Sequence, residues 1–116
     1  MRALRNRDVV CALAFIASLV SAPATANDPV DAAAAVVGEK YQVNIKKLFA
    51  TKCSWCHQGY GMKQADGPRL AGTSKTIEQI TKQINEGKSP MPGFRNQLSE
   101  KEIQALAEYI KTLPAN

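Results

Sequence analysis

The sequence predicts an all-α domain of three or more helices joined by long loops. Apolar residues recur at helical spacing in three separate segments of the 116-residue chain. The stretches between these segments are rich in glycine and proline, which favours loops. No segment shows the alternation of apolar and polar residues that is typical of a β-strand.

The first 26 residues have the layout of a secretory signal peptide. Arg2, Arg5 and Arg7 precede an apolar run at 9–20, and Ala-Thr-Ala at 24–26 supplies a cleavage pattern. An uncleaved N-terminal anchor is the alternative, but the run is shorter than the ~20 residues of a membrane helix. We predict cleavage after Ala26, export to the periplasm and no integral membrane span in the remaining chain.

Residues 27–116 are predicted to form one small domain. They carry 12 of the 15 basic and 9 of the 10 acidic residues, a balance too weakly basic to indicate a nucleic-acid partner. The only cysteines they contain are Cys53 and Cys56, so a framework of several disulfides is excluded. A domain of this size often needs a covalent or metal cross-link to supplement its core.

The predicted elements begin after an alanine-rich tail. Residues 27–38 lack a clear period, and we expect a tail with at most a helical turn after Asp31. A helix is predicted over 43–51, where an apolar face combines Ile45, Leu48 and Phe49. Glycines and prolines then predict a loop over 58–72, a length that is uncommon unless the loop wraps a ligand.

A second helix is predicted over 76–86. Its apolar stripe consists of Ile77, Ile80 and Ile84, Thr73 or Ser74 is the expected N-cap, and Gly87 is a typical C-terminal stop. A second loop follows at 88–97.

The last helix has the strongest signals. Ser99 and Glu102 fit a capping box, and Leu98 and Ile103 are placed as a hydrophobic staple. Pro114 marks its end. The predicted buried stripe is Ile103, Leu106, Ala107, Ile110 and Leu113.

The segment Cys53-Ser54-Trp55-Cys56-His57 is a C-x-x-C-H motif, which indicates covalent attachment of one c-type haem through both thiols. His57 is then placed to ligate the iron. A zinc site is the first alternative, but it requires four ligands and residues 27–116 offer no further cysteine or histidine. A thioredoxin-like redox pair is the second, and it requires a βαβ context that the pattern lacks.

The second axial ligand is predicted to be Met91. His57 is the only histidine in the chain, so two histidines of one molecule cannot ligate the iron. Met62 follows His57 by only five residues, too few to cross easily to the opposite haem face. Met91 lies beyond a full helix and between two prolines that stiffen its loop. The alternative is that Met91 only fills the core, as methionines often do.

Taken together, these features resemble the class I (monohaem, His/Met) cytochromes c of the small bacterial type. The resemblance runs from about Ile45 to Leu113. It is carried by Leu48-Phe49 before the motif, by the segment 66–72 with its G-P-x-L-x-G pattern, by the segment 87–92, and by 106–113 with Tyr109-Ile110.

The resemblance implies a small all-α fold with its helices and long loops wrapped around one haem c. It also implies that the Pro68 carbonyl accepts the His57 Nδ1–H and that Leu70 lines the haem. The last helix should cross the first. One departure is Asn44, which stands where the family usually has a glycine at that crossing. Trp55 is the other unusual residue; we expect it to fold onto the first helix or the loop near Tyr60, with a docking contact as the alternative.

The predicted function is single-electron transfer in the periplasm rather than enzyme catalysis. Axial sulfur from Met91 favours the ferrous state. We expect redox protein partners, namely a quinoprotein or flavoprotein dehydrogenase as donor and a downstream acceptor such as a terminal oxidase. The alternatives are a five-coordinate iron that binds small molecules and an obligate subunit of a dehydrogenase. Four basic residues flank the motifs, either as a ring that steers an acidic partner or as ordinary surface residues: Lys52, Lys63, Lys88 and Arg95.

Overall fold

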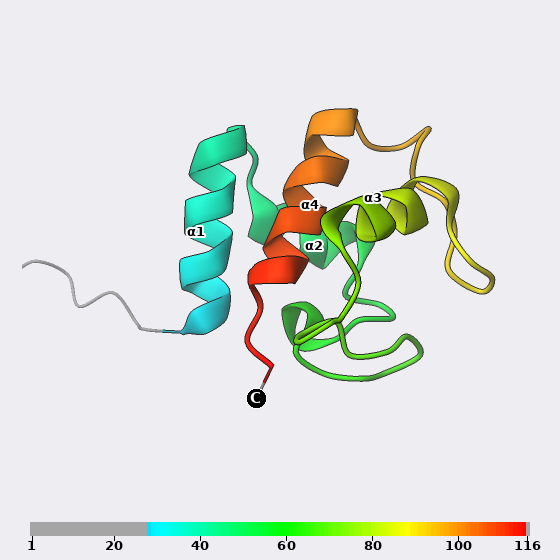
Figure 1. Ribbon diagram of the computed structural model, residues 1–116, viewed down its shortest axis with the longest axis horizontal. Coiled ribbons are helices and arrows are strands. Elements are labelled where there is room, and N and C mark those ends of the chain that lie inside the picture. The colour runs from blue at the N-terminus through cyan, green and yellow to red at the C-terminus, as the bar shows by residue number, and fades with distance from the viewer. Residues whose placement is uncertain (1–27, 116) are drawn as a thin grey trace, which may run out of the picture.

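The computed structural model describes residues 28–115 and contains four α-helices in this range (Figure 1). Their bounds are α1 (Pro29–Tyr41), α2 (Ile45–Lys52), α3 (Ile77–Glu86) and α4 (Glu100–Thr112), with a short 3₁₀ turn, η1 (Gly59–Gly61), after α2. Within 28–115 the only β-type pairing is an isolated bridge between Lys88 and Met91. The prediction of an all-α fold with long loops is therefore confirmed.

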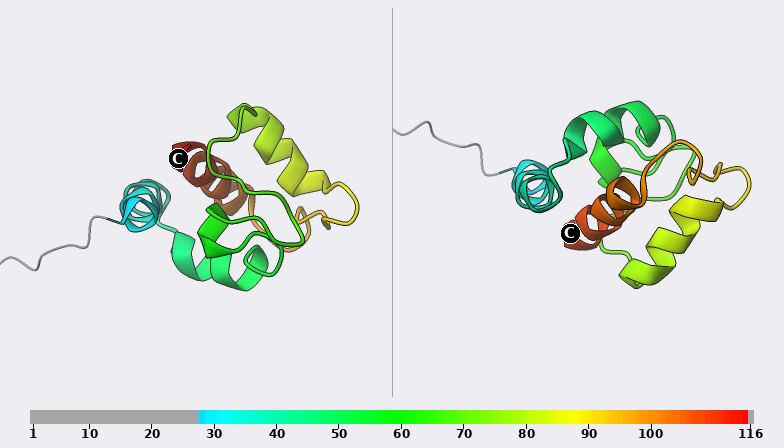
Figure 2. Two further views of the ribbon diagram at one scale, coloured as in Figure 1. Left: turned by 90° about the horizontal axis from the view of Figure 1, so that it is seen from below. Right: turned by 90° about the horizontal axis from the view of Figure 1, so that it is seen from above.

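Helix α4 lies at the centre of the molecule and contacts each of the other three α-helices. In all views α1 lies on one side of α4 and α3 on the other (Figures 1 and 2). The two long loops, 58–76 and 87–98, extend away from α1. These loops carry Pro68, Leu70 and Met91, three of the residues singled out in the sequence.

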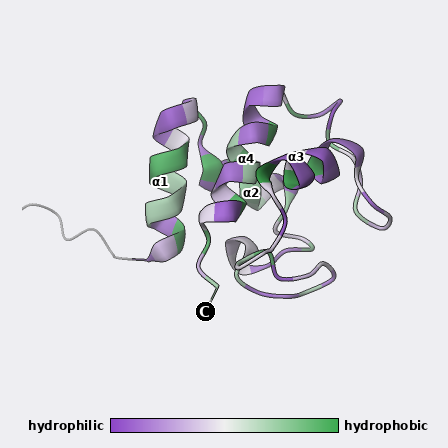
Figure 3. Cartoon of the chain, viewed as in Figure 1, coloured by the Kyte–Doolittle hydropathy of each residue, from purple (hydrophilic) through white to green (hydrophobic). Residues whose placement is uncertain are grey.

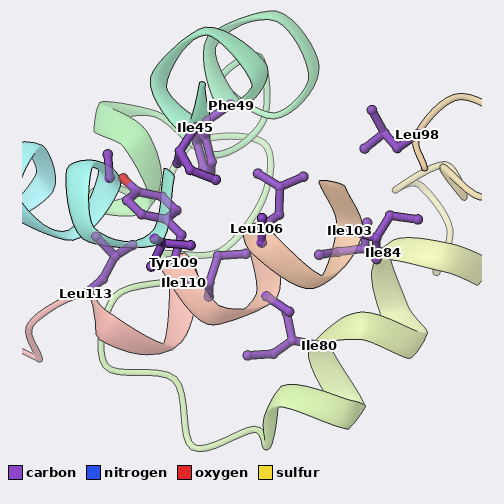
Figure 4. Close-up of a cluster of buried hydrophobic side chains, with 14 of the residues drawn as sticks. Ile45, Phe49, Ile80, Ile84, Leu98, Ile103, Leu106, Tyr109, Ile110 and Leu113 are labelled. Atoms are coloured by element: carbon purple, nitrogen blue, oxygen red, sulfur yellow. The ribbon is translucent and has the colours of Figure 1, made fainter. Parts of the chain in front are cut away.

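The three predicted helices form close to the expected bounds because the apolar stripes of α2 and α3 pack against that of α4. Ile80 and Ile84 of α3 and Ile45 and Phe49 of α2 are all at most 6 % exposed. Figure 4 shows these side chains directed toward the buried stripe of α4. That stripe consists of Ile103, Leu106, Ala107, Tyr109 and Ile110, with Ala105 also buried.

The helix caps refine the sequence predictions. The capping box of Ser99 and Glu102 is present, with both reciprocal hydrogen bonds. Helix α3 is capped by Thr76, in a capping box with Gln79, rather than by the predicted Thr73 or Ser74. Asn44 is the N-cap of α2 and accepts a hydrogen bond from the Lys47 amide. The departure at Asn44 is therefore explained by capping.

Helix α1 corrects the prediction of a tail over 27–38. Asp28 caps it by accepting from the Val30 amide, and Pro29 occupies the first turn, where a missing N–H has no effect. Its buried face consists of Val30, Ala34 and Val37. The alanines at 32–35 conceal the helical spacing of the buried residues, because alanine occupies both the buried and the exposed face. Hydropathy colouring shows hydrophobic and hydrophilic residues along the same helix (Figure 3). The predicted signal peptide, 1–26, lies outside the described residues.

Candidate haem-binding site

The C-x-x-C-H segment continues directly from α2. Cys53 is the C-cap of that helix, and its amide donates to the Phe49 carbonyl at 2.8 Å. The amides of Cys56 and His57 both donate to the Cys53 carbonyl, at 3.2 and 2.9 Å. This tight turn holds both cysteines and the histidine within one short segment anchored to the helical core.

The two cysteines are free thiols with different environments. Cys53 is half-buried and Cys56 is exposed. Burial raises the pKa of the Cys53 thiol to about 11. A thiol–disulfide redox pair relies on a thiolate of low pKa, so this environment argues against the thioredoxin-like alternative. Residues 28–115 also hold no group of three or more His, Cys, Asp or Glu side chains arranged to bind a metal.

His57 is held in a defined orientation by the first long loop, 58–76. It is the one buried polar or charged residue among those described, at 8 % exposed. Its Nδ1 lies 2.8 Å from the Pro68 carbonyl oxygen. Because a carbonyl only accepts, Nδ1 donates this hydrogen bond, and in the neutral imidazole Nε2 then carries the lone pair. This arrangement, in which one ring nitrogen is fixed by an acceptor, is typical of histidines that ligate metals.

Gly67 allows the loop to approach the imidazole closely. A Cβ at this position would lie 2.6 Å from Cε1 of His57 and 3.1 Å from the Cys56 carbonyl oxygen. The Gly67 amide also donates to that carbonyl at 2.8 Å. The backbone at 66–68 therefore covers one edge of the imidazole, and only glycine fits. The sequence marked Gly67 only as a loop-forming residue and as the first glycine of the G-P-x-L-x-G pattern, with no contact to His57.

An aromatic cluster fixes the motif relative to α4. Phe49 lies 5.6 Å from Tyr109 in an edge-to-face arrangement and 6.1 Å from Tyr60, measured between ring centroids. The Tyr109 hydroxyl donates to the Tyr60 carbonyl at 2.9 Å. Burial raises the pKa of Tyr109, which keeps this donor protonated. The cluster joins α2, η1 and α4 on both sides of the motif.

The loop that carries Met91 is fixed through its backbone. Lys88 and Met91 exchange both backbone hydrogen bonds, at 3.0 and 2.9 Å, and the Phe94 amide donates to the Ile84 carbonyl at 2.8 Å. Gly87 has φ +72°, and a Cβ there would lie 2.5–2.6 Å from backbone atoms of 91–93. The loop thus folds back tightly onto the end of α3.

The Met91 side chain is half-buried and packs against the core cluster. Its Sδ lies 4.0 Å from Nε2 of Gln83, a weak donor contact from α3. Met62 and Leu70 are also half-buried and pack against the same cluster. The structure thus joins His57 to Pro68 directly, while Met91 comes from the other loop. The contact of Gln83 with Met91 could not be predicted from the sequence, because it depends on how the loop 87–98 folds back onto α3.

Trp55 and the flanking basic residues lie on the surface. The Trp55 side chain is 83 % exposed, so the prediction that it folds onto the first helix or near Tyr60 is wrong. The tight turn of the motif directs it outward instead. Arg95 lies 3.8 Å from Glu86, whereas Lys52 contacts the neutral amide of Gln97.

The residues of the motif fit a covalently attached haem. Two unpaired thiols lie in one turn, the adjacent histidine has its other nitrogen engaged, and half-buried apolar side chains come from both loops.

Two surface hollows lie elsewhere, one between α1 and α2 and one beside α3 and α4, and none of the motif residues lines them. No helix within 28–115 has the length and apolar character needed to cross a membrane.

Comparisons with known proteins agree with this site. Residues 43–110 match the family model described as cytochrome c oxidase, cbb3-type, subunit III. The chain is similar to cytochrome c6 of Euglena gracilis, with 37 % identity over 73 residues that cover 56 % of this chain and 84 % of the relative. Cytochrome c6 of Leptolyngbya boryana is 36 % identical over 70 residues, which cover 55 % and 82 %.

A third relative is the cytochrome c subunit of menaquinol:cytochrome c reductase from Geobacillus thermodenitrificans, 38 % identical over 58 residues that cover 50 % of this chain and 23 % of the relative. No solved structure matches the chain. The family match includes the C-x-x-C-H motif and leaves out α1. The chain belongs to the monohaem class I c-type cytochromes, small electron carriers with one covalently bound haem c.

Proposed function

We propose that this protein is a periplasmic single-electron carrier whose haem iron is ligated by His57 and Met91. Residues 1–26 act as the signal peptide and 27–116 form the haem domain. The observation that best supports this proposal is the orientation of His57, whose Nδ1 lies 2.8 Å from the Pro68 carbonyl oxygen. The haem supplies the chemistry, a reversible change between ferric and ferrous iron.

The chain's own residues have distinct tasks in this proposal. Cys53 and Cys56 form the two thioether bonds, and the turn between them brings His57 beside the iron. Pro68 holds the imidazole through Nδ1, which would leave Nε2 to ligate the iron, and Leu70 would contribute apolar contact to the haem. Met91 would supply the second ligand from a loop fixed by backbone hydrogen bonds, and a methionine ligand would raise the reduction potential.

The proposed donor is a periplasmic dehydrogenase of the quinoprotein or flavoprotein type, and the proposed acceptor is a terminal oxidase or a similar protein. An iron ligated by both His57 and Met91 would have no vacant position for a substrate. The protein's task is then to exclude water from the iron and to leave a haem edge near the surface.

A second candidate is a resident subunit of a larger redox complex. It is supported by the family description, which names an oxidase subunit, and by the relative from a menaquinol:cytochrome c reductase. Purification of the native protein distinguishes the two, because a free carrier elutes at the size of a single small domain and a subunit elutes with its partners.

The proposal is tested on the exported, purified protein by absorption spectroscopy, redox titration and exposure to carbon monoxide. We expect a low-spin six-coordinate spectrum, a sulfur-to-iron charge-transfer band in the ferric state and no carbon monoxide binding. A high-spin spectrum with ready carbon monoxide binding would indicate a five-coordinate iron and overturn the His/Met assignment.

A further inference from the structure

Trp55 is an exposed aromatic side chain at the centre of the haem-attachment motif. At 83 % exposed, it and Val36, at 70 %, are the two large apolar residues on the surface of the described part of the chain. An indole left in water forgoes the stabilisation that burial of its apolar surface would give. The turn that directs Trp55 outward therefore leaves a large apolar surface that a partner could cover.

The backbone beneath Trp55 is held rigidly. The Ser54 amide donates to the Phe49 carbonyl at 3.1 Å, and the Cys56 and His57 amides donate to the Cys53 carbonyl. The indole therefore projects from a fixed turn. A rigid aromatic side chain loses little conformational entropy when a partner covers it, which is why such residues often dominate interfaces.

The chain around Trp55 is basic. Between residues 40 and 65 there are five lysines and no aspartate or glutamate. Two of these lysines are paired, Lys40 with Glu108 and Lys46 with Asp31. Within the described part of the chain, no carboxylate lies within ion-pair distance of the other three: Lys47, Lys52 and Lys63.

We propose that Trp55, with Lys52 before it and Lys63 after it in the sequence, anchors the docking of an acidic redox protein. This inference rests on the proposed function as an electron carrier and names the chemistry of its partner: an apolar contact for the indole, surrounded by carboxylates. Contact at Trp55 would bring the partner within two residues of both thioether positions. A second copy of this chain is a poor occupant, because it would bring two basic surfaces together.

The test uses holoprotein and an acidic flavodoxin as a defined probe. Ferrous holoprotein is titrated with oxidised flavodoxin by NMR, where the single tryptophan of the chain gives one indole N–H signal. Stopped-flow kinetics then measure one-electron transfer from flavodoxin hydroquinone, which becomes the semiquinone as ferric haem becomes ferrous. The variants are Trp55→Ala, Trp55→Phe and Lys52→Gln/Lys63→Gln, with Val36→Ala as the matched exposed apolar control.

We expect the Trp55 indole signal to shift on binding and Trp55→Ala to weaken both the affinity and the second-order rate by about tenfold. Trp55→Phe should recover part of the loss, and Val36→Ala should stay within twofold of the wild type. In the Lys52→Gln/Lys63→Gln variant, the electron-transfer rate should decrease less steeply with added salt than in the wild type.

Three results would overturn the proposal while leaving electron transfer intact: an unshifted indole signal, a Trp55→Ala rate within twofold of the wild type, or a wild-type rate that rises with salt. Dimerisation through Trp55, seen by sedimentation, would also overturn it. Failure of the proposed function is a separate result, because wild-type protein would then lack a haem spectrum or reversible reduction by ascorbate.

Discussion

Nδ1 of His57 lies 2.8 Å from the carbonyl oxygen of Pro68, and Gly67 makes this contact possible. The two residues are 11 positions apart, and the loop between them returns to the imidazole through a backbone hydrogen bond from Gly67 to Cys56. The orientation of the proposed proximal ligand thus depends on a residue that has no side chain.

Gly67→Ala is expected to disturb the histidine and lower the stability of the holoprotein. The added Cβ would lie 2.6 Å from the imidazole ring, and overpacking of this kind typically destabilises by about 1–3 kcal/mol. Denaturant titration and the ferric spectrum measure the two effects. Gln64→Ala, an exposed change on the same loop, is the control. An unchanged spectrum and midpoint for Gly67→Ala would show that the loop is looser than described.

Met91→Ala is expected to lower the reduction potential and to open the iron to carbon monoxide, because the variant loses a thioether that favours ferrous iron. Met62→Ala is the matched control, since Met62 is also half-buried against the core. It should keep the wild-type potential and exclude carbon monoxide. The reverse pattern in redox titration and carbon monoxide binding would identify Met62 as the ligand. His57→Ala should yield no stable holoprotein.

Val37→Ala is expected to destabilise the protein by about 1.5–3 kcal/mol, through lost burial of two methyl groups and the resulting cavity. Val37 is 3 % exposed where α1 packs on the domain, whereas the adjacent Val36 is 70 % exposed. Val36→Ala makes the same chemical change on the solvent side of the same helix and should stay within about 0.5 kcal/mol. Equal denaturation midpoints for the two variants would mean that α1 does not pack stably.

Thr76→Ala should cost about 1 kcal/mol of stability, because Thr76 is the N-cap of α3. Ser74→Ala removes a hydroxyl two residues earlier, at an exposed position that the sequence also favoured as a cap, and should have little effect. Thermal unfolding of the two variants compares them directly. A larger loss of stability in Ser74→Ala than in Thr76→Ala would instead identify Ser74 as the N-cap of α3.

Tyr109 gives a pH-dependent prediction. Its folded-state pKa is raised by burial, so above the ordinary tyrosine value of about 10 the unfolded chain releases this proton first. Stability should therefore decline as the pH rises past that value and be unaffected by Tyr109 below it. Tyr109→Phe should lose about 0.5–1.5 kcal/mol at neutral pH with the hydrogen bond to Tyr60, and its alkaline decline should be shallower. Parallel curves of unfolding free energy against pH for both proteins would contradict this account.

A helix could be predicted from the sequence where its apolar residues form a single face that packs against the core. The expected helix over 76–86 is observed as Ile77–Glu86, because the spacing of Ile80 and Ile84 directly reflects the packing of α3 on α4. Helix α1 was missed because alanine suits a buried and an exposed face equally well. Its packing depends on distant partners, such as the ion pair between Lys40 and Glu108, that local spacing does not reveal.

The motif could be predicted from the sequence, and the family resemblance implied the Pro68 acceptor, but the other supports could not be predicted. Cys53, Cys56 and His57 lie within five consecutive residues, so their chemistry follows from the residues alone. By contrast, the hydrogen bond from Tyr109 to Tyr60 spans 49 positions. The exposure of Trp55 was mispredicted for a similar reason, since the direction of a side chain in a tight turn depends on the backbone hydrogen bonds around it.

The backbone contacts that fix the loop of Met91 bear on the rate of the proposed electron transfer. Its position is set by backbone hydrogen bonds and by the close approach of Gly87 to 91–93, with little dependence on mobile side chains. If Met91 ligates the iron as proposed, a sulfur carried by this backbone would move little when the iron gains or loses an electron. The reorganisation energy at the metal would then be small, so a weak, brief encounter with a partner would suffice for transfer.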